Sequence, residues 1–279
     1  MWERLNDKGN QSLLIFFVLT FIITWGVWLL LISFQLESPL MKLGTFGPTL
    51  AALVLIGFQR GKSGFRELGA KLTRWRVSWI WYAVSLAGPV LVILAALQIY
   101  QALGGTGLVY NDPGEWYLIL VIFFYVLFTS VLGEEIGWRG YAFPRLMNSF
   151  SPLGASLSLG LIWGLWHLPL FWMPWDFHSE MAFFPFLIQV LASSVIYGWL
   201  YINTRGSLLI IHLFHTASNA SAGLLPLLPM DTGGDPRPFW LAVGLLTAAA
   251  VIIGLWCGSD LALNERKKAG CFLEMGKGE

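Results

Sequence analysis

The sequence predicts an all-α membrane protein with about eight helices that cross the bilayer. The chain of 279 residues is 56% hydrophobic and only 12% charged. Soluble domains carry about 25% charged residues, so this composition is typical of an integral membrane protein. The apolar residues also occur in long runs, and a helix needs about 20 of them to cross the hydrocarbon. No polar segment between the runs is long enough to fold separately, so residues 1–279 are predicted to form one membrane domain.

Eight candidate spans follow one another along the chain. The first, residues 13–34, is longer than the roughly 7–15 residue core of a signal peptide, so we expect it to stay as a membrane helix. The second, residues 43–58, is the shortest and contains Gly47-Pro48, a pair typical of turns and helix boundaries. The others are residues 77–103, 116–133 with an extension, 153–173, 182–203, 207–228 and 239–257.

Lys and Arg are distributed unevenly among the segments between the spans. With eight spans and both termini on one side, fifteen of the seventeen basic residues fall on that side, and only Lys42 and Arg237 fall on the other. Because cytoplasmic segments are enriched in Lys and Arg, this pattern predicts cytoplasmic N- and C-termini. The same rule accounts for the most basic loop, residues 60–76. An attraction to anionic lipid headgroups, or to a partner at that face, is the alternative reading of this loop.

Charge and cysteine content exclude several classes of partner. The net charge is only +1, whereas a nucleic-acid-binding protein has a strongly basic face, so no nucleic-acid partner is expected. The two cysteines show neither a CxxC pattern nor a spacing with histidine that would suit a structural zinc site. Membrane lipid is therefore the one partner that composition alone indicates.

Ionisable residues at membrane depth are confined to three of the eight spans. They are Glu134, Glu135 and Arg139 in the fourth, His167 in the fifth, and His212 and His215 in the seventh. Because a charge or an imidazole in hydrocarbon is costly, such residues usually face a polar interior and have a function. Carboxylates, an arginine and histidines supplied by separate helices are typical of a hydrolytic site.

The two adjacent glutamates in the fourth span, Glu134 and Glu135, are expected to have different environments. Glu135 and Arg139 are four residues apart with the glutamate first, the favourable order for an ion pair on one helix face. Glu134 points about 100° away on the helix and lacks this partner, so it is the candidate general base. Pro144 disfavours helical geometry at Phe143, and the helix is predicted to continue to about that residue. A salt-bridge cluster at a helix end is the alternative, which adjacent glutamates disfavour.

The fifth span places His167 one turn after Trp163 and two residues before Pro169. Proline removes a backbone hydrogen bond and can kink the helix at this point. A lone histidine in an apolar helix is more often a satisfied core residue than a catalytic one. This alternative stays open for His167 when its span is considered alone.

The seventh span places His215 and Asn219 on one face, four residues apart. An imidazole and a carboxamide arranged in this way can donate two hydrogen bonds to one oxygen, as the oxyanion of a tetrahedral intermediate requires. His212 either orients His215 or fills space in the core, and we favour the second role.

Together these groups predict attack of an activated water on a carbonyl. Glu134 and His167 would act as base and proton shuttle. A serine nucleophile is disfavoured because neither a GxSxG elbow nor a Ser-Lys arrangement is present. Glu134, His167 and His215 would suit zinc if a metal is bound. HExxH is absent, however, and no Asp or Glu is in an obvious position to orient the histidines, so no metal is assigned and metal-independent action is preferred.

Three motifs in this order resemble those of the CAAX prenyl protease and bacteriocin-processing (CPBP) family of intramembrane proteases. They are EExxxR, an aromatic residue four positions before a histidine, and HxxxN, and the matching context extends over residues 133–219. In this chain the motif residues are Glu134, Glu135 and Arg139, then Trp163 and His167, then His215 and Asn219.

The resemblance implies an eight-helix fold around a conical cavity that opens toward the cytosol, with the motif helices within residues 115–228. It also implies proteolysis near the C-terminus of a protein or peptide substrate, after a lipidated cysteine in the eukaryotic branch. Glu134 and His167 would activate water, and His215 with Asn219 would hold the oxyanion. Glu135 and Arg139 would brace the site. Family members have been described both as metalloproteases and as glutamate-dependent proteases, so the resemblance leaves a zinc cofactor open.

One residue departs from the family pattern. Trp163 stands where the family usually has phenylalanine, and its ring is expected to pack under the site and to change the volume of the pocket.

Two other functions compete with the protease. A non-catalytic membrane scaffold or chaperone would keep the fold and use the cavity to bind a partner. A proton-coupled transporter would use Glu and His as a relay, but such folds often contain inverted repeats, which this sequence lacks. Whether the substrate is prenylated is left open, and the tail CFLEMGKGE is not itself a CaaX box. In a bacterial or archaeal cell the expected location is the plasma membrane, with the site opening toward the cytoplasm.

Overall fold

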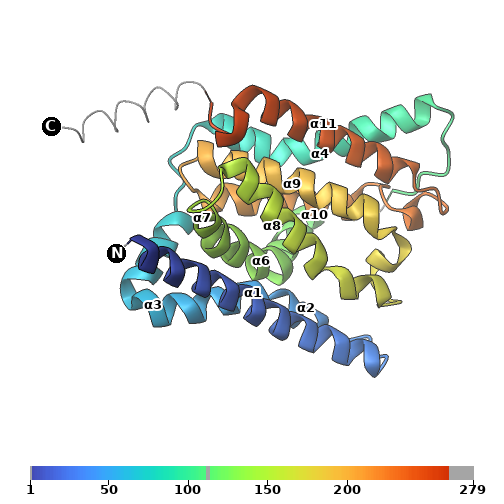
Figure 1. The fold of residues 1–279 in the computed structure, drawn as a ribbon. Helices are drawn as coiled ribbons and strands as arrows, with labels where there is room; N and C mark the ends of the chain where they lie inside the picture. Colours follow the sequence, from blue (N-terminus) through green and yellow to red (C-terminus); the bar gives the residue numbers. More distant parts are fainter. Residues whose placement is uncertain (1, 111–113, 264–279) are drawn as a thin grey trace.

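The computed structural model describes residues 2–110 and 114–263, with side chains from residue 11 onward. Every regular element in this part of the chain is helical (Figure 1), which confirms the all-α prediction. Seven helical segments among the described residues are long and apolar enough to cross a membrane. They are Gln11–Ser33, Trp79–Ala102, Leu118–Leu146, Pro152–Trp172, Phe183–Asn203, Leu208–Asp231 and Arg237–Asp260.

The predicted second span, residues 43–58, is not among these seven. It is divided between α2 (Met41–Thr45) and α3 (Gly47–Leu72), and the backbone of α3 is non-helical at Gly61, with φ 51° and ψ −136°. The apolar first half of α3 is followed directly by the polar residues 59–63, so it is too short to meet the length of a full span. It still packs in the bundle, where Ala51 and Ala52 are fully buried. The chain is therefore a polytopic membrane protein with seven long helices and a shorter eighth.

The helix that carries the acidic motif is continuous but irregular. It comprises α5 (Leu118–Val126), η1 (Leu127–Val131), α6 (Leu132–Glu135), η2 (Ile136–Ala142) and α7 (Phe143–Leu146), and both η1 and η2 are π-helical. The helix runs three residues past the predicted end at Phe143, which itself has helical geometry (φ −55°, ψ −50°). The wider π-turn before Pro144 accommodates a residue that cannot donate a backbone hydrogen bond.

The fifth predicted span ends early because of its proline. The helix α8 (Pro152–Trp166) stops three residues before Pro169, and His167 caps it. Two 3₁₀ turns follow, η3 (Leu168–Trp172) and η4 (Phe177–Glu180). His167 therefore lies at a helix end, beside irregular backbone. The remaining elements are α1 (Trp2–Ser33), α4 (Trp79–Ala102), α9 (Phe183–Asn203), α10 (Leu208–Leu224), η5 (Pro229–Asp231), α11 (Arg237–Cys257) and η6 (Gly258–Asp260).

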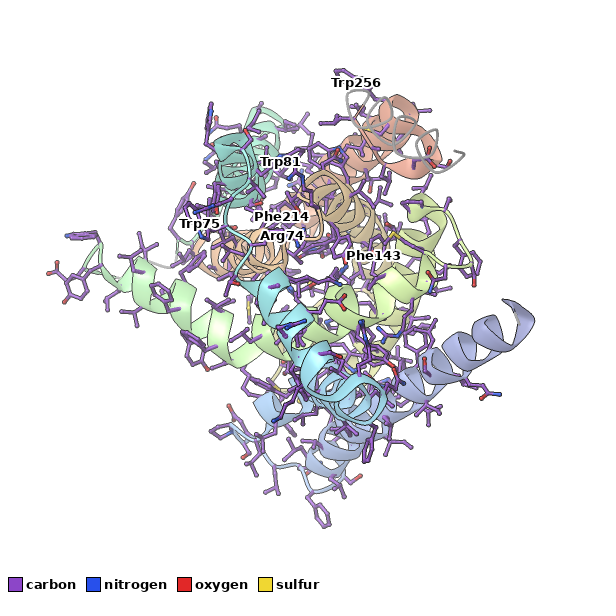
Figure 2. The ribbon with its side chains drawn as sticks, turned by 90° about the vertical axis from the view of Figure 1, so that its left-hand side faces the viewer. Arg74, Trp75, Trp81, Phe143, Phe214 and Trp256 are labelled. Atoms are coloured by element: carbon purple, nitrogen blue, oxygen red, sulfur yellow. The ribbon has the colours of Figure 1, made fainter. Side chains whose placement is uncertain are left out.

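The loops gather at two opposite ends of the bundle (Figure 1). The basic end comprises residues 59–78, 147–151, 204–207 and 258–263. Its loops are tied together by hydrogen bonds from the Arg74 guanidinium to the carbonyl of Arg205, at 2.5 Å, and from Asn203 to the carbonyl of Leu261, at 2.8 Å. Figure 2 looks toward this end, and Arg74 lies near the viewer. Its basic residues are Arg60, Lys62, Arg66, Lys71, Arg74, Arg76 and Arg205.

The acidic end comprises residues 34–46, 103–110, 114–117, 173–182 and 225–237. A hydrogen bond of 2.9 Å from the Val109 amide to the carbonyl of Asp231 joins two of its loops. Hydrogen bonds donated by Arg237 hold the pKa of Asp235 well below its ordinary value, so this carboxylate stays charged. The acidic residues of this end that the structure describes are Glu37, Glu115, Asp176, Glu180, Asp231 and Asp235, against the two basic residues Lys42 and Arg237.

Candidate active site

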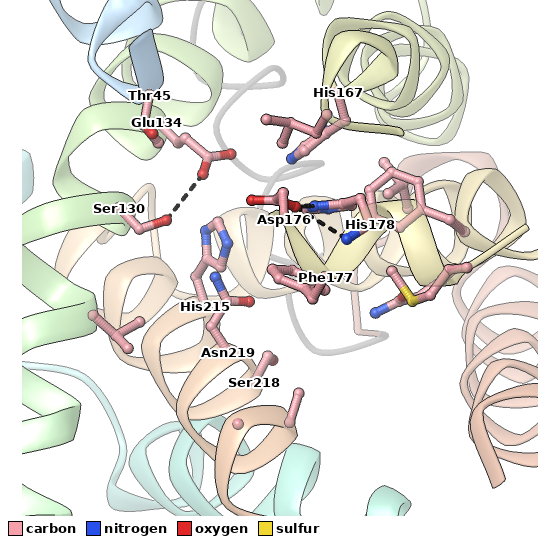
Figure 3. Close-up of a pocket in the computed structure, with 18 of the residues that line it drawn as sticks. Thr45, Ser130, Glu134, His167, Asp176, Phe177, His178, His215, Ser218 and Asn219 are labelled. Atoms are coloured by element: carbon pink, nitrogen blue, oxygen red, sulfur yellow. Dashed lines mark hydrogen bonds and ion pairs between the residues drawn. The ribbon is translucent and has the colours of Figure 1, made fainter. Parts of the chain in front are cut away.

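A cavity of about 410 Å³ lies within the helix bundle and is lined by five of the predicted site residues (Figure 3). They are Glu134, Trp163, His167, His215 and Asn219. The cavity reaches the surface at the acidic end, where Phe177 and Met230 line it and are 43% and 59% exposed.

Glu134 projects from α6 into the cavity and is only 3% exposed. Its Oε2 accepts a hydrogen bond of 2.7 Å from the indole Nε1 of Trp163. Ser130, one turn earlier on the same helix, donates a longer bond of 3.4 Å to Oε1. The tryptophan thus does more than pack under the site, since its N–H fixes one carboxylate oxygen. A phenylalanine at this position has no such donor.

Glu135 lies behind Glu134 and is fully buried. Its Oε1 is 2.9 Å from Nη1 of Arg139, which confirms the predicted ion pair between residues four apart. The Arg139 guanidinium is stacked over the rings of Trp163 and Tyr197, at 4.4 and 4.1 Å from their centroids. Because a buried charge needs several favourable contacts, this enclosure holds Arg139 in one position.

The same Oε1 of Glu135 also lies 2.8 Å from Nδ1 of His215. The expectation that no acidic residue orients the histidines is therefore wrong. Glu135 and His215 are 80 residues apart in sequence, so no short-range spacing pointed to the contact. With Nδ1 engaged by the carboxylate, Nε2 is the ring nitrogen of His215 that remains for a ligand in the cavity.

His167 is fixed by the backbone of its own helix. Its Nδ1 lies 2.8 Å from the carbonyl oxygen of Trp163. Because a carbonyl oxygen can only accept, Nδ1 carries the proton and Nε2 presents a lone pair. The ring also packs edge-on against Trp166 and Phe186. His167 is thus well packed against aromatic rings and also lines the cavity.

Asn219 follows His215 by one helical turn on α10 and lines the same cavity. His212, one turn before His215, does not line it. Its Nδ1 bonds the carbonyl of Leu208 at 2.6 Å, and its Nε2 is buried without a partner among the described residues. These contacts agree with a space-filling role for His212.

Asp176 and His178 also line the cavity and were not predicted from the sequence. The Asp176 Oδ1 bonds both Nδ1 and the backbone N–H of His178, at 2.5 and 3.0 Å. The His178 ring lies 5.6 Å from that of His167, centroid to centroid. Figure 3 shows the Asp176 carboxylate across the cavity from Glu134. The sequence signal that could have indicated this pair was an acidic residue and a histidine two positions apart, in the segment that follows Pro169.

No group of three His, Cys, Asp or Glu side chains in the described ranges has the spacing needed to hold a metal ion. Oε2 of Glu134 is bound by Trp163, and Nδ1 of His167 and of His215 is bound by the Trp163 carbonyl and by Glu135, which leaves Nε2 of both histidines facing the cavity. The remaining atoms could act on a water molecule, but they do not form a three-ligand set.

The fold and the cavity define a class of protein: a polytopic membrane protein in which a carboxylate, imidazoles and a carboxamide surround one pocket within the helix bundle. Such a set of groups is suited to hydrolysis inside the membrane.

Comparison with known proteins leads to the same class. Residues 115–221 match the family described as type II CAAX prenyl endopeptidase Rce1-like. The chain is also 26% identical over 267 residues to a protein named CAAX prenyl protease 2 from Methanococcus maripaludis, covering 88% of this chain and 94% of that protein. These matches confirm the resemblance to the CAAX prenyl protease family that was read from the three motifs.

Proposed function

We propose that this protein is an intramembrane endopeptidase that cleaves near the C-terminus of a protein or peptide, using water activated by Glu134 and His167. The observation that carries the proposal is the convergence of Glu134, His167, His215 and Asn219, from three separate helical segments, on one cavity. Chance packing would not be expected to direct these polar groups into the same space at membrane depth.

In the proposed mechanism the Glu134 carboxylate takes a proton from a water molecule held between it and Nε2 of His167. The water oxygen then bonds to the carbonyl carbon of the peptide. Trp163 keeps the carboxylate aimed at the water through its bond to Oε2. General acid–base catalysis of this kind contributes about 10²–10⁴-fold to a rate.

The carbonyl oxygen becomes negative as the water attacks, and His215 with Asn219 would stabilise it. The Glu135 carboxylate accepts a hydrogen bond from Nδ1–H of His215, so donation from Nε2 to the oxyanion requires the imidazolium form of His215, and its Nε2–H would act together with the Asn219 carboxamide. The proton taken from water then passes to the amide nitrogen, the C–N bond breaks, and an amine and a new carboxyl group are formed. Because the geometry is set before the substrate arrives, little reorganisation is needed during the reaction.

The apolar part of the cavity would bind the substrate segment. Trp28, Leu170, Met181 and Phe186 line it. Such a surface suits a hydrophobic side chain or a prenyl group. Both kinds of substrate therefore belong in the first assay. We propose that the reaction needs no metal, on the basis of the donor arrangement described above.

The test is a cleavage assay on purified protein in lipid, with quenched peptides that do or do not carry a prenyl-cysteine. Glu134→Gln should abolish cleavage, while Glu67→Gln is the matched control, because Glu67 is an exposed glutamate of the basic end. A Glu134→Gln variant that cleaves as fast as the wild type would contradict the mechanism. If that variant also restored the phenotype of a deletion strain, the scaffold function would be favoured.

A further inference from the structure

We propose that a second cavity, beside the loops of the basic end, binds a phosphate group, and that the headgroup of an anionic phospholipid supplies it. The cavity has a volume of about 650 Å³, within the range of about 300–1,000 Å³ that is common for ligand pockets. None of the seven predicted active-site residues lines it. The proposal is therefore separate from the protease function and does not depend on it.

The break in α3 builds one wall of this cavity. Gly61 has φ 51° and ψ −136°, a conformation that glycine adopts far more readily than other residues, and the helix is kinked there. Arg60 precedes the break and Glu67 and Lys71 follow it, yet all three line the cavity. Arg60 lies 2.5 Å from the Glu67 carboxylate across the break, and Lys71 lies 3.3 Å from its other oxygen. The break thus brings basic side chains from both halves of α3 to one place.

The end of the helix that carries the acidic motif forms another wall, to which Arg145 contributes. Its guanidinium lies over the ring of Tyr141, 3.4 Å from the centroid. It donates hydrogen bonds to the carbonyl oxygen of Tyr141, at 2.9 Å, and to the side-chain oxygen of Gln59, at 3.4 Å. Both acceptors are neutral, and Arg145 forms no ion pair within the described part of the chain. The guanidinium is therefore held in place while its charge has no counterion.

Positive charge exceeds negative charge around the cavity. Arg60, Lys71 and Arg145 line it, against the carboxylate of Glu67, whose charge is already shared by Arg60 and Lys71. An arginine has five N–H donors and a lysine three, so most of the charged donors remain available for a ligand. A guanidinium binds phosphate through two parallel hydrogen bonds. A phosphate group is therefore the ligand chemistry that this set of side chains fits.

The depth of the cavity favours a lipid as the source of the phosphate. Arg145 is one residue before the end of the apolar segment Leu118–Leu146, and Ser12 is the second residue of Gln11–Ser33. Arg60 comes two residues after Phe58, where the apolar half of α3 ends. Lipid headgroups lie at the depth where apolar segments end. Because basic pockets between membrane helices bind anionic headgroups, lipid phosphate is the expected ligand.

Native mass spectrometry of the full-length protein tests this proposal without any need for activity. The probes are phosphatidylglycerol and phosphatidylcholine, which share the phosphate group but differ in net charge. The wild type should bind phosphatidylglycerol about 10-fold more tightly or better. Arg145→Gln and Lys71→Gln should each weaken this binding about 10-fold, because each removes charged donors from the cavity. Equal affinity of the wild type for the two lipids would overturn the proposal.

Lys62→Gln and Arg66→Gln are the matched controls, because both residues are exposed on α3 and neither lines the cavity. Each should change the affinity by no more than about twofold, since exposed charges outside the site are screened by salt. Equal losses in all four variants would indicate a general basic surface and would also overturn the proposal. Lys71→Gln keeps the test decisive if Arg145→Gln does not fold, because the Lys71 side chain is partly exposed at the end of α3.

Inorganic phosphate is the other source of the same chemical group. An excess of it is added to the protein loaded with phosphatidylglycerol, and sodium chloride at the same ionic strength controls for screening. Retention of the lipid in both salts is the expected result. Displacement by phosphate and not by chloride would overturn the lipid as the source and assign the cavity to free phosphate.

Discussion

The indole N–H of Trp163 donates a hydrogen bond of 2.7 Å to Oε2 of Glu134. The two residues are 29 positions apart and come from different helices, so this bond links α8 to the helix that carries the acidic motif. It orients the carboxylate that we propose as the base. It also gives a role to the one position at which this chain departs from the family pattern.

Trp163→Phe should keep the fold and slow the reaction. A hydrogen bond to a charged group contributes about 1.5–3 kcal/mol, which corresponds to roughly a 10- to 100-fold loss of kcat if the bond acts mainly in the transition state. The matched control is Trp166→Phe, because Trp166 is buried on the same helix and its N–H has no partner among the described residues. Equal losses in the two variants, measured in the peptide assay, would show that ring size matters rather than the bond.

Asn219→Ala should lower kcat by about 10²–10³-fold with little change in KM, because an oxyanion donor acts mainly in the transition state. Ser218→Ala is the neighbouring control, since Ser218 also lines the cavity but its hydroxyl bonds the carbonyl of Phe214. Steady-state kinetics separates the two parameters. A raised KM with an unchanged kcat would instead assign Asn219 to substrate binding.

Arg139→Met should destabilise the protein by about 3–5 kcal/mol, because it leaves the buried Glu135 without its cation. The double variant Glu135→Gln with Arg139→Met should recover part of this loss. Arg60→Met is the control, since it breaks an exposed pair with Glu67, for which about 0–1 kcal/mol is expected. Thermal unfolding in lipid gives the comparison, and a double variant less stable than Arg139→Met would argue against the ion pair as the cause.

Treatment with EDTA should leave cleavage unchanged, because the donor atoms around the cavity form no three-ligand group in the described residues. The measurement is activity before and after chelation, with metal content determined on the same sample. Loss of activity that added zinc restores would assign a metal to Glu134, His167 and His215 and replace the proposed mechanism.

Gly137→Ala should weaken the packing of η2 against α3. A Cβ at residue 137 would lie 2.5 Å from the backbone carbon and oxygen of Pro48, which cannot move away without shifting the helix. Small residues permit such close helix contacts in membranes. Gly244→Ala is the control, because a Cβ there meets nothing within 4 Å. The expected result is a lower unfolding temperature for Gly137→Ala alone.

Much of the fold was predictable because apolar length and proline act locally. The long helices lie close to their predicted ranges, and the break after His167 follows from Pro169. The continuation of the helix past Pro144 was not predictable, because it depends on a π-helical turn that no residue pattern indicates. The second span was predicted as one helix over residues 43–58, but the structure divides this range between α2 and α3, and polar residues follow its apolar part directly after Phe58.

The candidate site was predictable where its spacing lies within one helix. The Glu135–Arg139 pair and the shared face of His215 and Asn219 follow from the helical repeat. Contacts between segments far apart in the sequence could not be predicted from helical spacing. The bond from Glu135 to His215 depends on how α10 packs against α6, and the Asp176–His178 pair sits in a loop without periodicity.

The buried ion cluster has a consequence for how the chain is assembled. The helix with Glu135 and Arg139 is synthesised well before His215, yet the glutamate contacts both residues in the folded protein. Charged residues at the centre of a lone helix oppose its transfer into lipid by about 2.5–3.5 kcal/mol each. We therefore expect residues 118–146 to be held at the insertion machinery, or beside earlier helices, until α10 has been made. Release of this helix before α10 arrives would leave its charges facing lipid.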